Sequence, residues 1–216
     1  MIISNYQSDS IGNVVYLQKP CKRVVSIDFD YHHWQYKKTF FLSLPYTFFR
    51  LIYVAERNKF FYTEARFMSI GFGTSEDPNV LFRPPFPNVF ANLNCCSPVD
   101  INRFSSVEDL IKAQINCFWS AEFSYTKENK YDAAGLYCPT YNSFVGLTSY
   151  VDQYEADALI VDHRKWEQKT KENPKWIPDE NDMLRCYPDG DTFLYGLSVG
   201  AKMKYLSKNG QTERIR

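Results

Sequence analysis

The chain has 216 residues, of which 44% are hydrophobic and 23% are charged. These values are ordinary for a folded globular protein and exclude a disordered or fibrous chain; the length favours one large domain over two small ones. Lysine and arginine together number 25, as do aspartate and glutamate. Because no net charge draws the chain toward phosphate backbones or anionic lipid, we expect neither a nucleic-acid partner nor a membrane partner.

The sequence carries no pattern typical of a membrane anchor or a secretory signal. Its longest apolar stretch, residues 39–49, is interrupted by Ser43 and Pro45 and is far shorter than the roughly 20 residues that span a bilayer. The first ten residues, MIISNYQSDS, lack a basic segment followed by an apolar one. We therefore expect a cytoplasmic location.

Cysteine usage argues against a metal centre. Six cysteines stand at irregular spacings without a C-x-x-C pair, whereas zinc ribbons and redox dithiols need such pairs. We expect no metal and no cofactor, and we expect most of the cysteines to be small buried hydrophobic residues. The cysteines are Cys21, Cys95, Cys96, Cys117, Cys138 and Cys186, and the histidines are His32, His33 and His163.

Aromatic residues make up 17% of the chain, an unusually high share. One interpretation is that some rings lie on a surface, since aromatic residues are enriched at the centres of protein interfaces. The other is a coding bias that favours Phe, Tyr, Asn and Lys. The sequence leaves both open.

The first half of the chain is rich in strand-like runs. Two long runs of aromatic and branched residues flank a polar break at residues 56–59, which predicts an antiparallel hairpin that starts after Pro45. The strand-like runs lie at residues 14–17, 24–29, 46–54, 60–70 and 80–82.

A proline-rich segment and then a helix follow. Pro84, Pro85 and Pro87 remove amide donors and fix φ, so this segment is expected to be extended and irregular. Residues 105–108, Ser-Ser-Val-Glu, fit a capping box, and apolar residues then recur at helical spacing. Those residues are Val107, Leu110, Ile111, Ile115 and Phe118.

The remaining segments complete an α+β prediction. Residues 124–148 are expected to form a loop, and a second helix should run from Ser149 or Tyr150 to Glu172, with a charged and solvated later half. Residues 192–199 and 201–206, joined at Gly200, should form a terminal hairpin. The expected organisation is an N-terminal β extension (1–38), an α+β core with an antiparallel meander (39–180) and a C-terminal hairpin extension (181–216), in one domain overall.

The proline segment and the residues after it carry a resemblance. Pro85, Pro87, Asn88 and Cys96, with strands before them and a helix after, resemble the active-site segment of the ubiquitin-conjugating-enzyme-like (UBC-like) superfamily. In that family a Pro-Asn pair precedes the acceptor cysteine by eight residues, as Asn88 precedes Cys96. The resemblance is nearest to prokaryotic and phage members such as the B component of the PRTRC system, and it covers roughly residues 40–175.

The resemblance implies a site and partners. Cys96 would accept an acyl group as a thioester, which requires an accessible and partly deprotonated thiol. Asn88 would donate a hydrogen bond to the oxyanion when a lysine attacks. Pro85, Pro87 and Cys95 would form the scaffold, and the partners would be a ubiquitin-like modifier and its activating enzyme.

Three positions depart from the family pattern. Phe86 stands where a histidine is common, and Leu93 stands where a glycine is expected between the asparagine and the cysteine. Ser97-Pro98 replaces the usual ending after the cysteine. The loss of a glycine where φ can be positive implies a remodelled loop, or a domain that kept the shape and lost the activity.

Alternatives remain open at the level of the sequence. The Cys95-Cys96 pair could be buried structure, and alternation allows only one of the two to face solvent, with the spacing to Asn88 favouring Cys96. His163, Asp100 and Asp132 could each lie near the cysteine. The alternative function is a non-catalytic structural or interaction subunit of a phage or other large assembly, which would make the protein a virion or assembly component.

Overall fold

The structure, a computed structural model, is an α+β arrangement of mainly antiparallel sheets and two α-helices among the residues that it describes. The α+β prediction is therefore confirmed at this level. The described residues are 1–31, 34–57, 59–63, 68–77, 80–86, 89, 93–95, 102–121, 123–125, 136–138, 143–145 and 158–185.

The larger sheet is centred on β5 (Tyr46–Ala55). This strand pairs antiparallel with β2 (Ile11–Gln18) on one side and with β7 (Met68–Gly73) on the other. The predicted hairpin is confirmed, because the strands that follow β5 run antiparallel to it and Pro45 precedes it. The sheet is completed by β1 (Ile2–Ser8) beyond β2, by β8 (Phe82–Arg83) and β12 (Leu184–Arg185) beyond β7, and by β6 (Phe61–Tyr62) beside β5.

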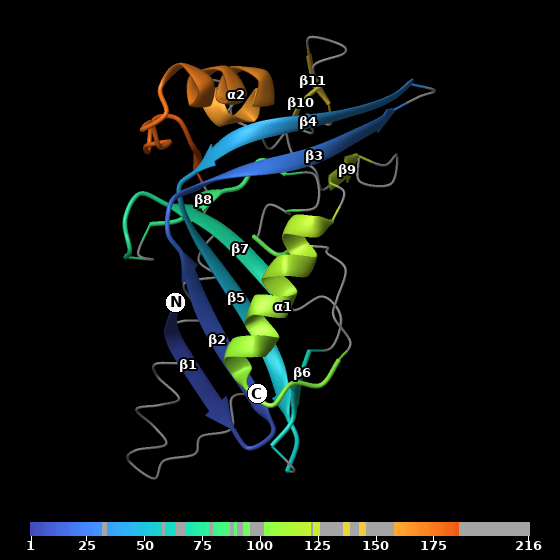
Figure 1. Cartoon of the computed structure of the whole chain (residues 1–216), viewed down its shortest axis with the longest axis vertical. Helices are drawn as coiled ribbons and strands as arrows, with labels where there is room; N and C mark the ends of the chain where they lie inside the picture. The colour runs from blue at the N-terminus through green and yellow to red at the C-terminus, as the bar shows by residue number, and fades with distance from the viewer. Residues whose placement is uncertain are drawn as a thin grey trace.

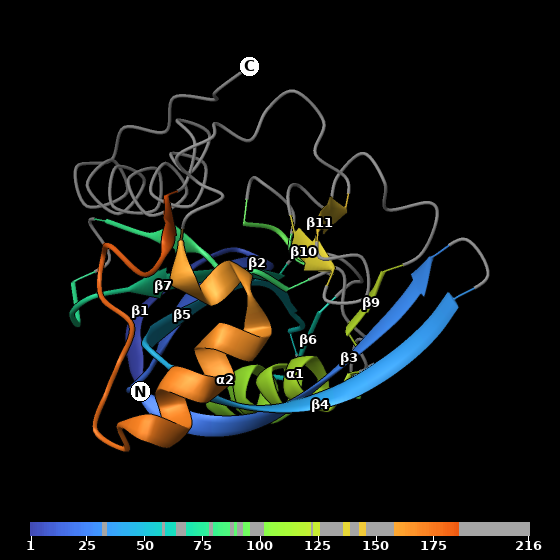
Figure 2. The same ribbon diagram turned by 90° about the horizontal axis from the view of Figure 1, so that it is seen from above.

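A long hairpin leaves the larger sheet between β2 and β5 and forms a second sheet (Figure 1). Strand β3 (Cys21–Tyr31) pairs antiparallel with β4 (Trp34–Leu44), and β9 (Phe123–Tyr125) joins β3 in parallel. Figure 2 shows the hairpin curving past the end of α1. The apolar stretch at residues 39–49 is thus divided at Pro45 between two strands, β4 and β5.

The first helix, α1 (Val107–Ser120), packs on one face of the larger sheet (Figure 1). Its N-cap is Ser106, whose hydroxyl accepts a hydrogen bond from the amide of Asp109 at 3.1 Å. The predicted capping box is therefore one residue too early, because Ser106 and Asp109 repeat the spacing of Ser105 and Glu108. The predicted apolar face is confirmed, with Leu110, Ile111, Ile115 and Phe118 all buried.

The second helix was predicted to begin at Ser149 or Tyr150. The structure describes residues 158–161 of its first half, and there the prediction is wrong. Residues Leu159–Val161 form a 3-10 turn, η2, and α2 (His163–Glu172) begins only after it. The reason is local, since the Asp162 carboxylate caps the helix by accepting from the amides of Arg164 and Lys165. The predicted end at Glu172 is confirmed, whereas residues 149–157 lie outside the described chain.

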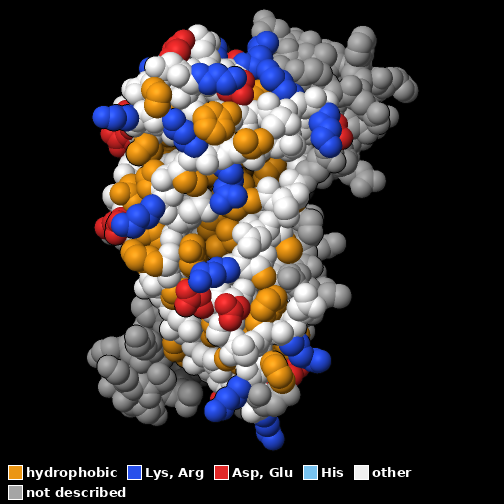
Figure 3. All heavy atoms as spheres, in the orientation of Figure 1, with side chains coloured by type: hydrophobic (Ala, Val, Ile, Leu, Met, Phe, Trp, Pro, Cys, Tyr) orange, Lys and Arg blue, Asp and Glu red, His pale blue; other side chains and the backbone are white. Residues whose placement is uncertain are grey.

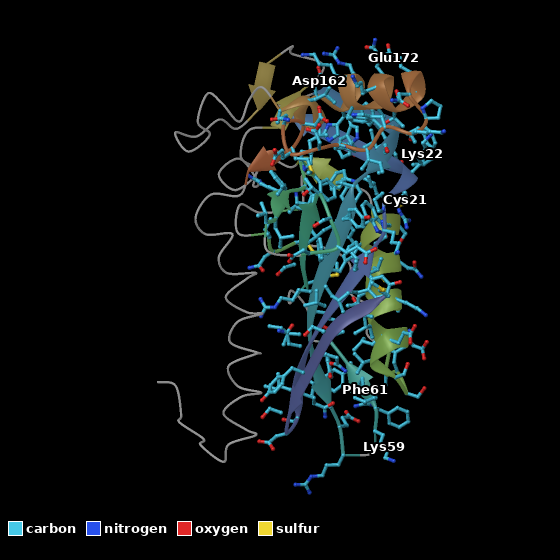
Figure 4. All side chains as sticks on the ribbon, turned by 90° about the vertical axis from the view of Figure 1, so that its left-hand side faces the viewer. Cys21, Lys22, Lys59, Phe61, Asp162 and Glu172 are labelled. Carbon is cyan, nitrogen blue, oxygen red and sulfur yellow. The ribbon has the colours of Figure 1, made fainter. Side chains whose placement is uncertain are left out.

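Helix α2 covers the open edge of β4 (Figures 1 and 4). The amide of Ser43 donates to the Thr170 hydroxyl at 3.0 Å, and the indole of Trp166 donates to the Ser43 carbonyl at 2.9 Å. The amide of Phe41 donates to the Glu167 carboxylate at 2.9 Å. The prediction of a solvated later half is therefore wrong for one side of the helix, which satisfies strand groups that would otherwise be an exposed edge.

Two further segments bear on the sequence predictions. The predicted loop at residues 124–148 contains strands, because β9 reaches Tyr125 and β10 (Leu136–Cys138) pairs with β11 (Ser143–Val145). The predicted hairpin at residues 192–206 lies outside the described residues. Within the described part of the chain, no helix has the length and apolar character needed to cross a membrane.

Most of the large rings in the described core come together in one place. A main cluster joins the inner faces of both sheets to α1 and α2 and includes Phe40, Phe49, Phe86, Phe118 and Trp166. A smaller cluster lies on the opposite side of the larger sheet and consists of Val15, Leu17, Phe48, Leu81 and Leu93. Both clusters contain residues of the proline segment or of the segment before the cysteine pair, so the candidate site is built into the core.

Candidate functional site

The structure describes two of the five residues that the sequence assigns to the site, namely Pro85 and Cys95. Pro87, Asn88 and Cys96 lie outside the described residues. The described residues on either side of them define the geometry around the site. We call the described residues 83–86 and 89 the strip and residues 93–95 the cysteine segment.

The strip is held at both of its ends. Arg83 is buried in β8, and its Nη2 donates to the carbonyl oxygen of Val89 at 3.0 Å. The amide of Val89 in turn donates to the carbonyl of Phe86 at 3.0 Å. The side chain of Arg83 thus bridges the first and last residues of the strip, a role that the sequence analysis missed.

Phe86 lies in the middle of the aromatic core. Its side chain is fully buried, and its ring stacks on Phe123 with centroids 4.9 Å apart and an interplanar angle of 16°. Trp119 meets the same ring edge-on at 5.9 Å. A phenylalanine suits this position, because an apolar ring gains from burial here and an imidazole would need a polar partner.

A histidine reaches the strip from a distant part of the chain. The imidazole of His163, the first residue of α2, lies with its Nε2 3.0 Å from the carbonyl oxygen of Pro85. Because a carbonyl only accepts, Nε2 carries the proton and donates. Burial lowers the pKa of His163 to about 4, so the ring is neutral at physiological pH. Its Nδ1 is buried and makes no hydrogen bond within the described structure.

The cysteine segment lies beside β7. The amide of Cys95 donates to the carbonyl of Met68 at 3.0 Å, and the Cys95 thiol approaches the same oxygen at 3.3 Å. Cys95 also forms a β-bridge with Val89, which ties the cysteine segment to the strip. The side chain of Cys95 is only 3% exposed, so its thiol is inaccessible to a protein partner.

Leu93 has an unusual backbone conformation. Its φ is 66°, in the left-handed region that favours glycine. Its side chain is nevertheless fully buried in the smaller cluster, and its carbonyl accepts from the amide of Ile70 at 2.8 Å. A leucine therefore holds a left-handed backbone conformation here, and the burial of its side chain offsets the backbone strain.

The described residues show what this arrangement offers chemically. It is a buried, mostly apolar support with one neutral histidine and one buried thiol, and Asn88 and Cys96 adjoin it in the sequence. No group of three or more potential metal ligands occurs among the described residues. His163 was left open by the sequence because it stands 78 residues from Pro85. The local signal for this contact is the proline-rich segment itself. Because such a segment has few amide donors, its buried carbonyls need a donor from elsewhere in the chain.

Comparison with protein families, with curated proteins and with solved structures finds no match to this chain.

Proposed function

We propose that the protein is a UBC-like thioester carrier for a ubiquitin-like modifier, with Cys96 as the acyl acceptor and Asn88 as the oxyanion donor. The observation that carries the proposal is the inward placement of Cys95, whose thiol is buried against β7. Neighbouring side chains on an extended segment point to opposite faces. We therefore assign the solvent-facing role to Cys96, the residue with the family spacing to Asn88.

The order of elements supports the same proposal. Strands β2, β5, β7 and β8 pair in succession, and the strip, the cysteine segment and α1 follow them in the chain. The UBC-like family likewise has strands before the proline strip and a helix after the cysteine. Two features depart from the family pattern. The hairpin β3–β4 is inserted between strands, and the larger sheet includes β2, which precedes the start of the predicted core at residue 39.

The chemistry would proceed by two acyl transfers. The Cys96 thiolate attacks the thioester carbonyl of the modifier on its activating enzyme, and the thiolate of that enzyme leaves. A substrate amine then attacks the new thioester, the Cys96 thiolate leaves, and the amine loses a proton as the amide forms. The side chain of Asn88 donates a hydrogen bond to the oxyanion that forms when the amine attacks.

The test is adduct formation in cells that contain the cognate activating enzyme and modifier. A tagged wild-type chain is expected to show a higher-mass band that thiol reductant removes. Cys96→Ser should lose this band or replace it with a reductant-resistant ester, whereas Cys95→Ser and Cys21→Ser should keep it. Retention of the reductant-sensitive band in Cys96→Ser would exclude Cys96 as the acceptor.

A second candidate function is a non-catalytic subunit of a phage or other large assembly. One observation favours it, namely a cross-strand apolar pair on the projecting hairpin, where Val24 is 59% exposed and its partner Phe41 is 37% exposed. Figure 3 shows that apolar side chains also reach the surface over much of the face that Figure 1 presents. Such surface is typical of protein contacts.

The two candidates differ in a measurable way. A structural subunit should co-purify with assembly partners through the hairpin, and Val24→Lys or Phe41→Lys should release them without affecting any thioester. If the protein stays monomeric and retains no partner from its own host, the assembly function is contradicted.

A further inference from the structure

The Pro85 carbonyl is a buried acceptor in a segment that has few donors of its own. Pro84 and Pro85 lack amide hydrogens, and the Val89 amide donates to the Phe86 carbonyl, so few donors of the strip remain for the Pro85 carbonyl. The donor comes instead from His163 on α2, at 3.0 Å. A buried carbonyl without a partner is strongly unfavourable, so this contact determines where the strip can rest.

The imidazole is itself held in place by the scaffold. Its ring lies 5.4 Å from that of Phe40 and is stacked at 6.1 Å on Trp166 of the same helix. Helix α2 is fixed in turn by the hydrogen bonds of Trp166, Glu167 and Thr170 to β4. The donor is therefore held in place relative to β4, and the strip is positioned against it. Figure 4 labels the N-cap of α2, Asp162, and its last residue, Glu172.

Contacts continue from this point to the cysteine segment. Phe86, next to Pro85, accepts from the amide of Val89, and Val89 forms the β-bridge with Cys95. The path from His163 to Cys95 thus consists of hydrogen-bonded or bonded neighbours, all of them buried.

We infer that His163 is the positioning residue of the candidate site: its Nε2–H holds the Pro85 carbonyl and so fixes the strip and the cysteine segment bound to it. The inference rests on the proposed function, which gives the placement of these segments its purpose. His163 touches no reacting atom in this account, and it acts only through Pro85.

The experiment measures alkylation of Cys95 by iodoacetamide in the native protein, followed at the peptide level by mass spectrometry. His163→Phe keeps a ring and removes the donor, whereas His163→Gln places an amide N–H at a similar reach. His163→Asn, with an amide too short to reach Pro85, replaces the phenylalanine variant if that variant does not fold. Thr170→Val is the matched control, because it removes a buried hydrogen bond of α2 to β4 and none to the strip.

We expect His163→Phe or His163→Asn to raise the Cys95 alkylation rate by roughly five- to thirtyfold, the factor that follows from losing one buried hydrogen bond. His163→Gln should stay within about threefold of wild type. When the two variants have lost equal global stability, Thr170→Val should raise the Cys95 alkylation rate less than His163→Phe. The reason is that His163→Phe also promotes local opening of the strip, which exposes Cys95 without global unfolding.

Two results would overturn the inference: equal rates for His163→Phe and Thr170→Val at matched stability, or no rescue by His163→Gln. The readout is independent of any modifier. If the Cys95 rates behave as expected but no thioester forms on the wild-type chain in cells, the proposed function fails while the positioning role stands.

Discussion

His163 Nε2 donates a buried hydrogen bond to the Pro85 carbonyl oxygen, across 78 positions of sequence. This contact joins the start of α2 to the proline strip and requires a proton on Nε2 of His163. Because burial lowers the pKa of His163 to about 4, the ring that makes this contact at physiological pH is neutral. The candidate site is thus connected to the packing of a helix that lies far away in the chain. This connection depends on the protonation state of His163.

Folding stability is predicted to fall as the pH drops below neutrality. Burial lowers the pKa of His163 from 6.5 to about 4, so the unfolded chain binds a proton that the folded chain does not bind between these values. The stabilising contribution is complete above the unfolded pKa and is lost progressively as the pH falls toward the folded pKa, by up to about 3 kcal/mol.

Urea denaturation of wild type and His163→Gln at about pH 7 and about pH 5 checks this prediction, because glutamine does not titrate. Wild type should lose more stability than the variant over this range. Parallel losses in the two proteins would show that other groups cause the pH dependence.

At position 93 we expect the usual order of stability, in which an alanine variant is more stable than a glycine variant, to be reversed. Leu93→Ala empties a buried position and keeps the left-handed backbone, so it should cost about 2–5 kcal/mol. Leu93→Gly creates the same cavity and relieves roughly 1 kcal/mol of backbone strain at φ 66°. The glycine variant should therefore be at least as stable as the alanine variant in chemical denaturation.

Leu17 provides the control for this comparison. It is buried in the same small cluster, within strand β2, and has no positive φ. There, Leu17→Gly should be less stable than Leu17→Ala by roughly 0.5–1 kcal/mol. The same order at both positions would argue against strain at Leu93.

The corrected cap of α1 leads to a paired prediction. Ser106→Ala removes the hydroxyl that accepts from the Asp109 amide and should cost about 1 kcal/mol. Ser105→Ala, at the position first favoured by the sequence, should change the free energy of unfolding very little. Thermal or urea unfolding of the two variants decides between them, and a larger loss at Ser105 would restore the original assignment.

The contact of α2 with β4 is predicted to contribute to stability through a single hydroxyl. Thr170→Val leaves the Ser43 amide buried without an acceptor and should cost about 1–3 kcal/mol. Thr170→Ser keeps the hydroxyl and should cost less, since only a methyl group is lost. Urea denaturation measures both, and a serine variant as unstable as the valine variant would contradict the role of this hydrogen bond.

Local patterns in the sequence predicted the elements that depend on neighbouring residues. The spacing of Leu110, Ile111, Ile115 and Phe118 predicted the buried face of α1, and the polar break at residues 56–59 predicted the antiparallel pairing of β5 with the strands after it. Helix periodicity and strand composition are readable within one element, so they need no knowledge of the rest of the chain.

Features that depend on distant contacts could not be predicted in this way. The charged composition of α2 indicated a solvated helix, but Thr170 and Glu167 bind the edge of β4, 127 and 126 residues earlier in the chain. Arg83 and His163 hold the strip through carbonyl oxygens, which leave no pattern in the sequence. Leu93 marks another such case, because its positive φ is supported by the cluster around its side chain.

The accessibility of the two neighbouring cysteines tests the central claim most directly. Native protein is treated briefly with iodoacetamide, then denatured and labelled with a second reagent, and Cys95 and Cys96 are quantified separately by fragmentation of their shared peptide. We predict that Cys96 reacts in the folded protein. Cys95 should react only after denaturation, because it is buried in the folded protein. Protection of Cys96 until denaturation would contradict the proposal, because a thioester carrier needs an accessible thiol.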